Sequence, residues 1–118
     1  MEGPPAPEQW ATIELAENGP RAGADSGTPM TRHLGFPVGS TNNTKATGLW
    51  SCTPGGWPVQ NRVDTETVYI ISGTGTITDA ADGKTHALAP GTWHTLPTGW
   101  SGRWDVTSTL RKLYILTP

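Results

Sequence analysis

Glu66 is the residue of this chain whose type and position most clearly suggest chemistry. It is the only glutamate after residue 17, and the five residues that follow it, 67–71, are all strand formers. A carboxylate that faces the interior of a β-structure is costly unless it is paired or coordinates a cation. Three interpretations are therefore open: Glu66 ligates a metal, pairs with Arg62, or acts as a general acid or base beside a substrate that Arg62 holds.

Histidine is the other residue type here that suits proton transfer, because its ordinary pKa of about 6.5 allows both charge states near neutral pH. His94 lies in an expected strand, 92–96, just before a Pro-x-Gly turn. If Trp93 packs outward, strand alternation places His94 in the interior, where it would join Glu66 as a second catalytic residue.

The composition indicates that strands, not helices, position these residues. The 118 residues include fifteen glycines, eleven prolines and nineteen threonines, and only 34% are hydrophobic. No stretch repeats apolar residues at helical spacing. Eight short β-type runs, separated by turn signals, are expected at residues 46–53, 57–63, 66–72, 76–78, 84–88, 92–96, 102–106 and 110–116. This pattern favours an all-β sandwich or barrel.

The chain is expected to divide near residue 45. Residues 1–44 carry few apolar side chains and cannot bury enough surface to fold alone, whereas residues 45–118 hold the strand pattern. We expect an extended and partly ordered N-terminal arm followed by a barrel. Four large apolar residues would hold the arm against the barrel or a second subunit: Trp10, Ile13, Leu34 and Phe36.

Strand alternation also assigns a substrate site to the barrel interior. With Glu66 pointing inward, Gln60 and Arg62 on the preceding strand line the same cavity and would orient a substrate. Trp104, and Trp57 at the mouth, offer flat faces that would stack on a planar molecule. The other tryptophans are expected in the core, at an interface or on the arm.

Composition and charge argue against several other kinds of partner. The net charge is −2 and the eight Lys and Arg residues are scattered, so neither nucleic acid nor an anionic membrane is expected. No apolar run approaches the ~20 residues that span a bilayer. The single cysteine, Cys52, excludes an internal disulfide and a Cys-based zinc site. The N-terminus does not read as a signal peptide, and we expect a cytoplasmic protein.

Several motifs in this chain resemble those of the cupins, a family of small jelly-roll barrels. Four segments carry the resemblance: Glu66-x6-Gly73, Gly91-x5-Pro97-x-Gly99, Gly48-x-Trp50-x-Cys52-x-Pro54-Gly55 and Pro97-x-Gly99-Trp100-x-Gly102-x-Trp104. The last two are similar to segments of the single-domain cupins grouped with the ureidoglycine aminohydrolase cupin domain. The resemblance covers about residues 46–116 and implies a single jelly-roll barrel.

The same resemblance implies a metal site whose ligands this sequence does not retain. Metal-binding cupins present His-x-His before the glutamate and a third His after the Pro-x-Gly turn. Those positions here hold Gln60, Arg62 and Gly102, and only Glu66 remains. A guanidinium has no lone pair to offer a cation. We therefore predict no cofactor and no metal ligands, with a divalent metal as the alternative.

Together these residues predict a cupin that acts on a small organic molecule by metal-independent acid–base chemistry. Isomerase, cyclase, lyase and hydrolase reactions all stay open. One alternative is a binding cupin that uses the same pocket without turnover, and another is a metal-dependent hydrolase similar to ureidoglycine aminohydrolase. A homodimer is expected, because a sheet face that carries Tyr69, Ile71 and Trp93 would favour association.

Overall fold

The structure is a computed structural model that describes residues 4–39 and 43–118. The described residues form one short 3-10 helix and nine strands: η1 (Pro7–Gln9), β1 (Ala16–Pro20), β2 (Ser26–Gly27), β3 (Met30–Gly35), β4 (Ala46–Cys52), β5 (Gly55–Val59), β6 (Thr65–Asp79), β7 (Thr85–Leu88), β8 (Trp93–Leu96) and β9 (Gly102–Thr117). None of these elements is a helix long and apolar enough to cross a membrane.

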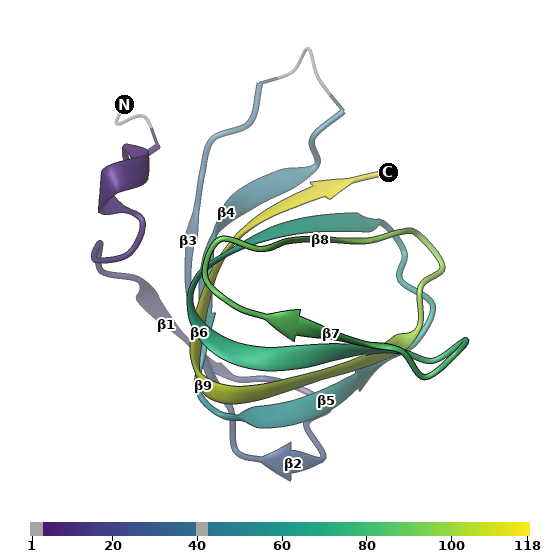
Figure 1. The fold of residues 1–118 in the computed structure, drawn as a ribbon. Helices are drawn as coiled ribbons and strands as arrows, with labels where there is room; N and C mark the ends of the chain where they lie inside the picture. Colours follow the sequence, from purple (N-terminus) through teal and green to yellow (C-terminus); the bar gives the residue numbers. More distant parts are fainter. Residues whose placement is uncertain (1–3, 40–42) are drawn as a thin grey trace.

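The strands form one sheet that curls back on itself, so that two leaves face each other (Figure 1). β6 and β9 pair with each other along most of their length and run through both leaves. One leaf has the order β1, β3, β4, β9, β6, β8, and the other has the order β2, β5, β9, β6, β7. The all-β jelly-roll barrel expected from the sequence is confirmed.

Gly73 allows β6 to pass from one leaf to the other. Its φ is +92°, in the left-handed region that favours glycine, and a Cβ there would collide with the backbone oxygen of Thr109 on β9. The pairing register with β9 shifts between Ile70 and Gly75, as in a β-bulge. The strand expected over 66–72 does not end at Gly73, because the bulge bends the chain and β6 continues beyond it.

The other expected strands differ from the structure mainly at their ends. The runs at 102–106 and 110–116 are joined into the single strand β9, which bends with β6. β1, β2 and β3 lie within residues 1–44 and were not expected as strands. β3 and β2 form because the edges of β4 and β5 offer them unpaired backbone groups, and β1 then pairs with β3.

The main hydrophobic core lies between the two leaves. Its buried members alternate along the strands with residues that face outward. They are Cys52, Trp57, Val68, Ile70, Ile77, Leu88, Leu96, Trp104, Val106 and Leu110. This core fills the space between the leaves next to the cavity described below.

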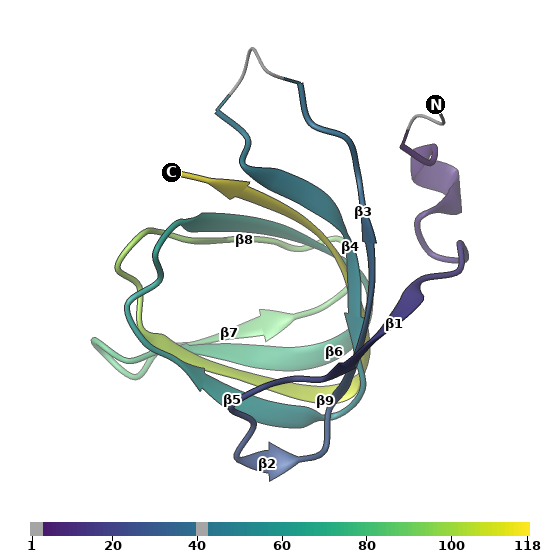
Figure 2. The same cartoon turned by 180° about the vertical axis from the view of Figure 1, so that it is seen from behind.

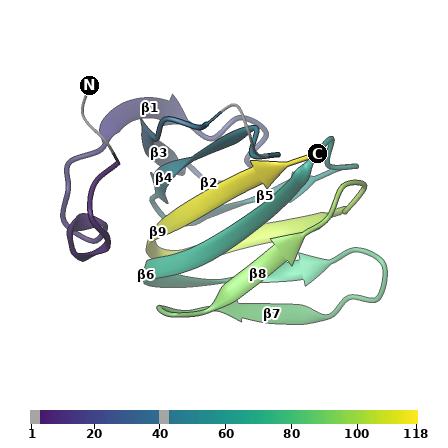
Figure 3. The same ribbon diagram turned by 90° about the horizontal axis from the view of Figure 1, so that it is seen from above.

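A second apolar cluster lies on the outer face of the leaf that contains β4, and the arm covers it (Figure 2). Leu15 of the arm is buried there against Leu49 of β4 and Leu113 of β9. Seen from above in Figure 3, η1 and β1 lie beside the end of this leaf. The four expected anchors of the arm pack around this cluster: Trp10, Ile13, Leu34 and Phe36.

The arm also covers part of the face on which the homodimer prediction was based. Tyr69 and Ile71 pack against the second cluster, and the Trp10 ring meets Tyr69 edge-on at 6.4 Å between centroids. Trp93 keeps 59% of its surface exposed. The apolar face available to a second copy is therefore smaller than the sequence suggests, and the homodimer stays a prediction.

Candidate functional site

A cavity of about 340 Å³ lies between the two leaves. Small-molecule sites commonly measure roughly 300–1,000 Å³. Aromatic side chains form much of the lining: Trp50, Trp57, Trp104 and Tyr114. Charged side chains form another part: Arg21, Arg62, Glu66 and Lys112. The cavity thus combines flat apolar surfaces with groups that hold or move charge.

The strand register explains why these side chains converge. Trp57 on β5 stands directly opposite Trp104 on β9, and Trp50 on β4 stands opposite Lys112 on β9. Directly opposed residues of an antiparallel pair project from the same face of the sheet. Alternation along β9 then adds Tyr114, two residues beyond Lys112.

Glu66 is paired with two cationic side chains in this cavity. Lys112 Nζ lies 2.8 Å from Oε2 of Glu66, and Arg62 Nη1 lies 3.3 Å from Oε1. Glu66 and Lys112 are each only 6% exposed. The Glu66–Arg62 pair considered from the sequence is confirmed, and Lys112 is a further partner.

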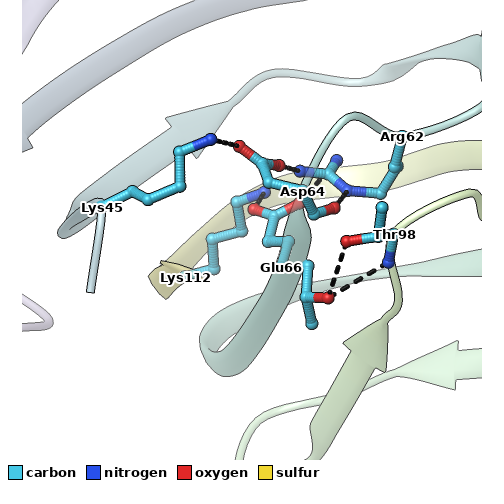
Figure 4. A network of polar contacts seen from close by, with 7 residues as sticks. Lys45, Arg62, Asp64, Glu66, Thr98 and Lys112 are labelled. Atoms are coloured by element: carbon cyan, nitrogen blue, oxygen red, sulfur yellow. Dashed lines mark hydrogen bonds and ion pairs between the residues drawn. The ribbon is translucent and has the colours of Figure 1, made fainter. Parts of the chain in front are cut away.

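Asp64 fixes the guanidinium of Arg62 from the other side. Arg62 donates from Nη2 to the Asp64 carboxylate at 2.8 Å and from Nε to the Asp64 backbone oxygen at 3.1 Å. Lys45 Nζ lies 3.4 Å from the second Asp64 oxygen. Figure 4 shows the resulting chain of charges from Lys45 through Asp64 and Arg62 to Glu66 and Lys112. Arg62 is thereby held as a positioning group for Glu66.

The three indole rings form a continuous wall around the Lys112 ammonium. Lys112 Nζ lies 4.3 Å from the ring centroids of both Trp50 and Trp104, within the range of cation–π attraction. Trp57 stacks on Trp104 with 6.0 Å between centroids and an interplanar angle of 9°. Trp50 meets Trp57 edge-on at 6.0 Å and 69°. The protein's own Lys112 ammonium is therefore already in contact with two of these rings.

The arm closes one side of the cavity. His33 on β3 shares a hydrogen bond with the Tyr114 hydroxyl through Nε2, and the His33 tautomer decides which of the two donates. Burial, with a smaller effect of the Glu66 charge, raises the pKa of Tyr114. Its hydroxyl is therefore protonated at neutral pH. Arg21 follows β1 and places its guanidinium carbon 5.2 Å from the centroid of Trp57.

The positions at which metal-binding cupins hold a metal ion do not suit a cation in this chain. Both carboxylate oxygens of Glu66 already face a cationic nitrogen, from Lys112 or Arg62. Residue 102 is a glycine, and Gln60 is exposed and does not line the cavity. Within residues 4–39 and 43–118, no three His, Cys, Asp or Glu side chains are grouped so as to hold a metal ion.

The placement of Gln60 corrects the sequence-based assignment. β5 ends at Val59, whose side chain lines the cavity, so the next residue, Gln60, faces solvent. Asn61 then adopts a positive φ of 46° and turns the chain. This turn brings the Arg62 side chain back to the cavity. Simple alternation along an unbroken strand does not explain how Arg62 reaches it.

His94 lies in a different hollow from Glu66. The pairing of β6 with β8 sets Leu96 opposite Glu66 and His94 opposite Val68, so the expected catalytic pair is not formed. His94 lines an open hollow of about 850 Å³ between β7 and β8. Burial, and to a smaller extent the charge of His86, lowers the pKa of His94.

The remaining predicted residues, Glu66, Arg62, Trp57 and Trp104, do meet in one cavity. Five other aromatic or basic residues that line it were not expected there: Arg21, His33, Trp50, Lys112 and Tyr114. Alternation in the expected strand 110–116 could have indicated Lys112 and Tyr114, because it places both on the same face as Leu110. No local pattern marks Arg21 or His33, since the arm reaches the cavity only through tertiary pairing.

Comparison with solved structures shows the same fold in several proteins. A protein of unknown function from Pseudomonas syringae is 19% identical with a TM-score of 0.78, over 90% of this chain and 45% of that chain. A putative ethanolamine utilization protein Q from Salmonella typhimurium is 18% identical with a TM-score of 0.67, over 92% and 81% of the two chains. Ectoine synthase from P. lautus is 21% identical with a TM-score of 0.63, over 80% and 67%.

These identities are low, and they show the fold alone. The chain described here spans less than half the length of the Pseudomonas protein. A search among curated proteins gives no match. The EutQ-like cupin domain family, however, matches residues 39–114, which is most of the chain. The chain therefore belongs to the EutQ-like cupin domain family.

Proposed function

We propose that the Glu66 cavity binds a small, flat organic molecule and acts on it by acid–base chemistry without a metal. The observation that carries the proposal is the environment of Glu66. The carboxylate expected to ligate a metal is paired with Lys112 and Arg62 instead, inside a cavity walled by three indoles. Such a cavity offers apolar walls and fixed charges, a combination that is common in small-molecule sites.

Glu66 and Tyr114 are the proton-transfer groups of this proposal. The Glu66 carboxylate accepts a proton from the substrate, and the Tyr114 hydroxyl donates one to a substrate oxygen. His33 stands behind Tyr114 in hydrogen-bond contact and can restore its proton. Lys112 and Arg62 hold the carboxylate in place and stabilise negative charge that develops nearby. Isomerisation, cyclisation, elimination and hydrolysis each use such a pair of proton transfers.

Ectoine synthase from P. lautus, which has a similar fold, is by its name an enzyme that makes a small organic compound. It supports action on a small molecule and does not specify the reaction. The alternative of a hydrolase similar to ureidoglycine aminohydrolase requires a metal. The donor set around Glu66 does not supply the ligands for one.

A binding cupin without turnover is the second candidate, and one feature of the Glu66 geometry supports it. Each oxygen of Glu66 is engaged by a cationic partner, and a base that must take up a proton would have to give up part of that contact. In this case Glu66 would shape the cavity and a ligand would only stack on the indoles.

Turnover and binding by the Glu66→Gln variant separate the two candidates. Small aromatic and unsaturated compounds are screened by tryptophan fluorescence for binding and by mass spectrometry for product. Glu66→Gln should abolish product formation and leave binding measurable, while Trp104→Ala should weaken binding. Glu17→Gln removes an exposed carboxylate and is the matched control. Unchanged turnover by Glu66→Gln contradicts the acid–base proposal, and ligand binding without any product supports the binding cupin.

A further inference from the structure

Three cationic side chains line the cavity, and two of them are matched by carboxylates. Lys112 pairs with Glu66, and Arg62 pairs with Asp64 as well as Glu66. Arg21 is the third, and it forms no ion pair with any residue in the described parts of the chain. The cavity therefore has one positive charge without an anionic partner.

Arg21 also lies against the aromatic lining of the cavity, where a ligand in the cavity would contact its guanidinium. Its guanidinium carbon lies 5.2 Å from the Trp57 centroid, and Trp57 continues the wall through its stack with Trp104. One guanidinium donor is used by the Ala22 backbone oxygen. A guanidinium has five N–H donors in a planar fork, so others are left to bind a carboxylate in a bidentate manner.

We infer that the ligand of this cavity is a small organic carboxylate, which pairs with Arg21 while its apolar part lies among the aromatic side chains that line the cavity. This inference rests on the proposed function and names the class of ligand. Because Arg21 belongs to the arm, the arm supplies the charge recognition and the barrel supplies the aromatic walls.

Benzoate and benzamide are the probes that test the carboxylate. The two molecules share ring size and shape and differ in charge, so their affinity ratio reports the contribution of a carboxylate partner. Isothermal titration calorimetry should show benzoate binding about tenfold or more tighter than benzamide, as expected for a charge-assisted hydrogen bond. Arg21→Met should bring the affinity for benzoate close to that for benzamide, and it should weaken benzoate binding much more than benzamide binding.

Arg32→Met is the matched control, since Arg32 is an exposed arginine of β3 that pairs with Glu17 and does not line the cavity. It should keep the full preference for benzoate. Thermal unfolding of each variant shows that the fold is retained.

Other results of the titrations with benzoate and benzamide would contradict the inference. Equal binding of the two probes, or a preference that survives Arg21→Met, overturns the carboxylate inference and leaves the proposed cavity function standing. Failure of both probes to bind the parent protein at millimolar concentration contradicts the inference and the proposed function together.

Discussion

Lys112 supplies the positive charge that the buried carboxylate of Glu66 needs. Its Nζ lies 2.8 Å from Oε2 of Glu66, and the same ammonium lies 4.3 Å from the Trp50 and Trp104 ring centroids. A buried carboxylate without a positive partner is strongly unfavourable. In this cavity the partners are Lys112 of β9 and, at 3.3 Å from the other carboxylate oxygen, Arg62.

Removing one member of the Glu66–Lys112 pair should cost more stability than removing both. Glu66→Leu leaves the Lys112 ammonium buried without a carboxylate, and we expect a loss of about 3–5 kcal/mol in the free energy of unfolding. Glu66→Leu combined with Lys112→Met should lie within about 1 kcal/mol of the parent, because Arg62 keeps Asp64 as its partner. Urea denaturation of the parent, both single variants and the double variant measures the coupling.

The exposed pair of Glu17 and Arg32 is the control for this cycle. Its atoms are 3.6 Å apart and its side chains are 85% and 51% exposed, so the same analysis should give a coupling below about 1 kcal/mol. A Glu66→Leu variant as stable as the parent would show that the buried pair does not matter for folding.

Gly73 should tolerate a side chain much less well than Gly83. Both have a positive φ, +92° at Gly73 and +72° at Gly83, so alanine costs about 1–2 kcal/mol of backbone strain at either. A Cβ at Gly73 also collides with the Thr109 backbone, whereas at Gly83 it meets nothing within 4 Å. We expect Gly73→Ala to lose about 1–3 kcal/mol more than Gly83→Ala in thermal unfolding. Equal losses would rule out the collision as the reason for glycine in the bend.

The bend at Gly73 also shows how far the sequence predicts the fold. The strand formers on both sides were recognised, because β-branched runs and turn residues are local signals. The continuation through Gly73 was not, since it depends on how β6 and β9 bulge together. β3 was missed for a similar reason: residues 30–35 have no alternation, and they pair because β4 offers an edge.

The site was predictable only where a single strand determined it. Glu66, Trp57 and Trp104 follow from alternation within their own strands. His94 has its ring on the expected face, but the register between β6 and β8 sets Leu96 beside Glu66. From the sequence alone, a lysine at position 112 is expected on the solvated surface. Its aromatic and acidic environment becomes visible only where three strands converge.

Arg111 should be required to hold the arm against the barrel. Its Nη1 donates to the backbone oxygens of Trp10 and Ile13, both at 2.8 Å. Arg111→Met keeps the apolar stem and removes both bonds, so we expect proteolytic cleavage within residues 4–15 to become about tenfold faster or more. Limited proteolysis followed by mass spectrometry measures the rate. Lys84→Met, which removes a positive charge from the exposed β6–β7 turn, should cleave at the parent rate, and an unchanged rate in Arg111→Met would contradict this role.

Cys52 should be chemically silent in the folded protein. The residue is fully buried, and burial raises the pKa of its thiol to about 11 despite the opposing charges of Lys112 and Arg21. We expect no labelling by a thiol reagent near pH 8, and full labelling once urea unfolds the chain. A variant with Cys52→Ala and Ala81→Cys places the thiol on an exposed turn and should react at once. Rapid labelling of the parent would mean that the core opens easily.

His94 should make the protein less stable as the pH falls below about 6.5. Burial mainly, and the His86 charge, lower the pKa of His94 in the folded state, while the unfolded chain keeps the ordinary value of about 6.5. Between the two values the unfolded state binds the additional proton, so the free energy of unfolding decreases as the pH falls through this window. His94→Asn should reduce this decrease when urea midpoints are compared from about pH 7 to pH 5. NMR titration of the His94 ring protons provides the direct check. A titration midpoint above 6.5, or an identical pH dependence in His94→Asn, would show that the hollow between β7 and β8 does not desolvate this ring.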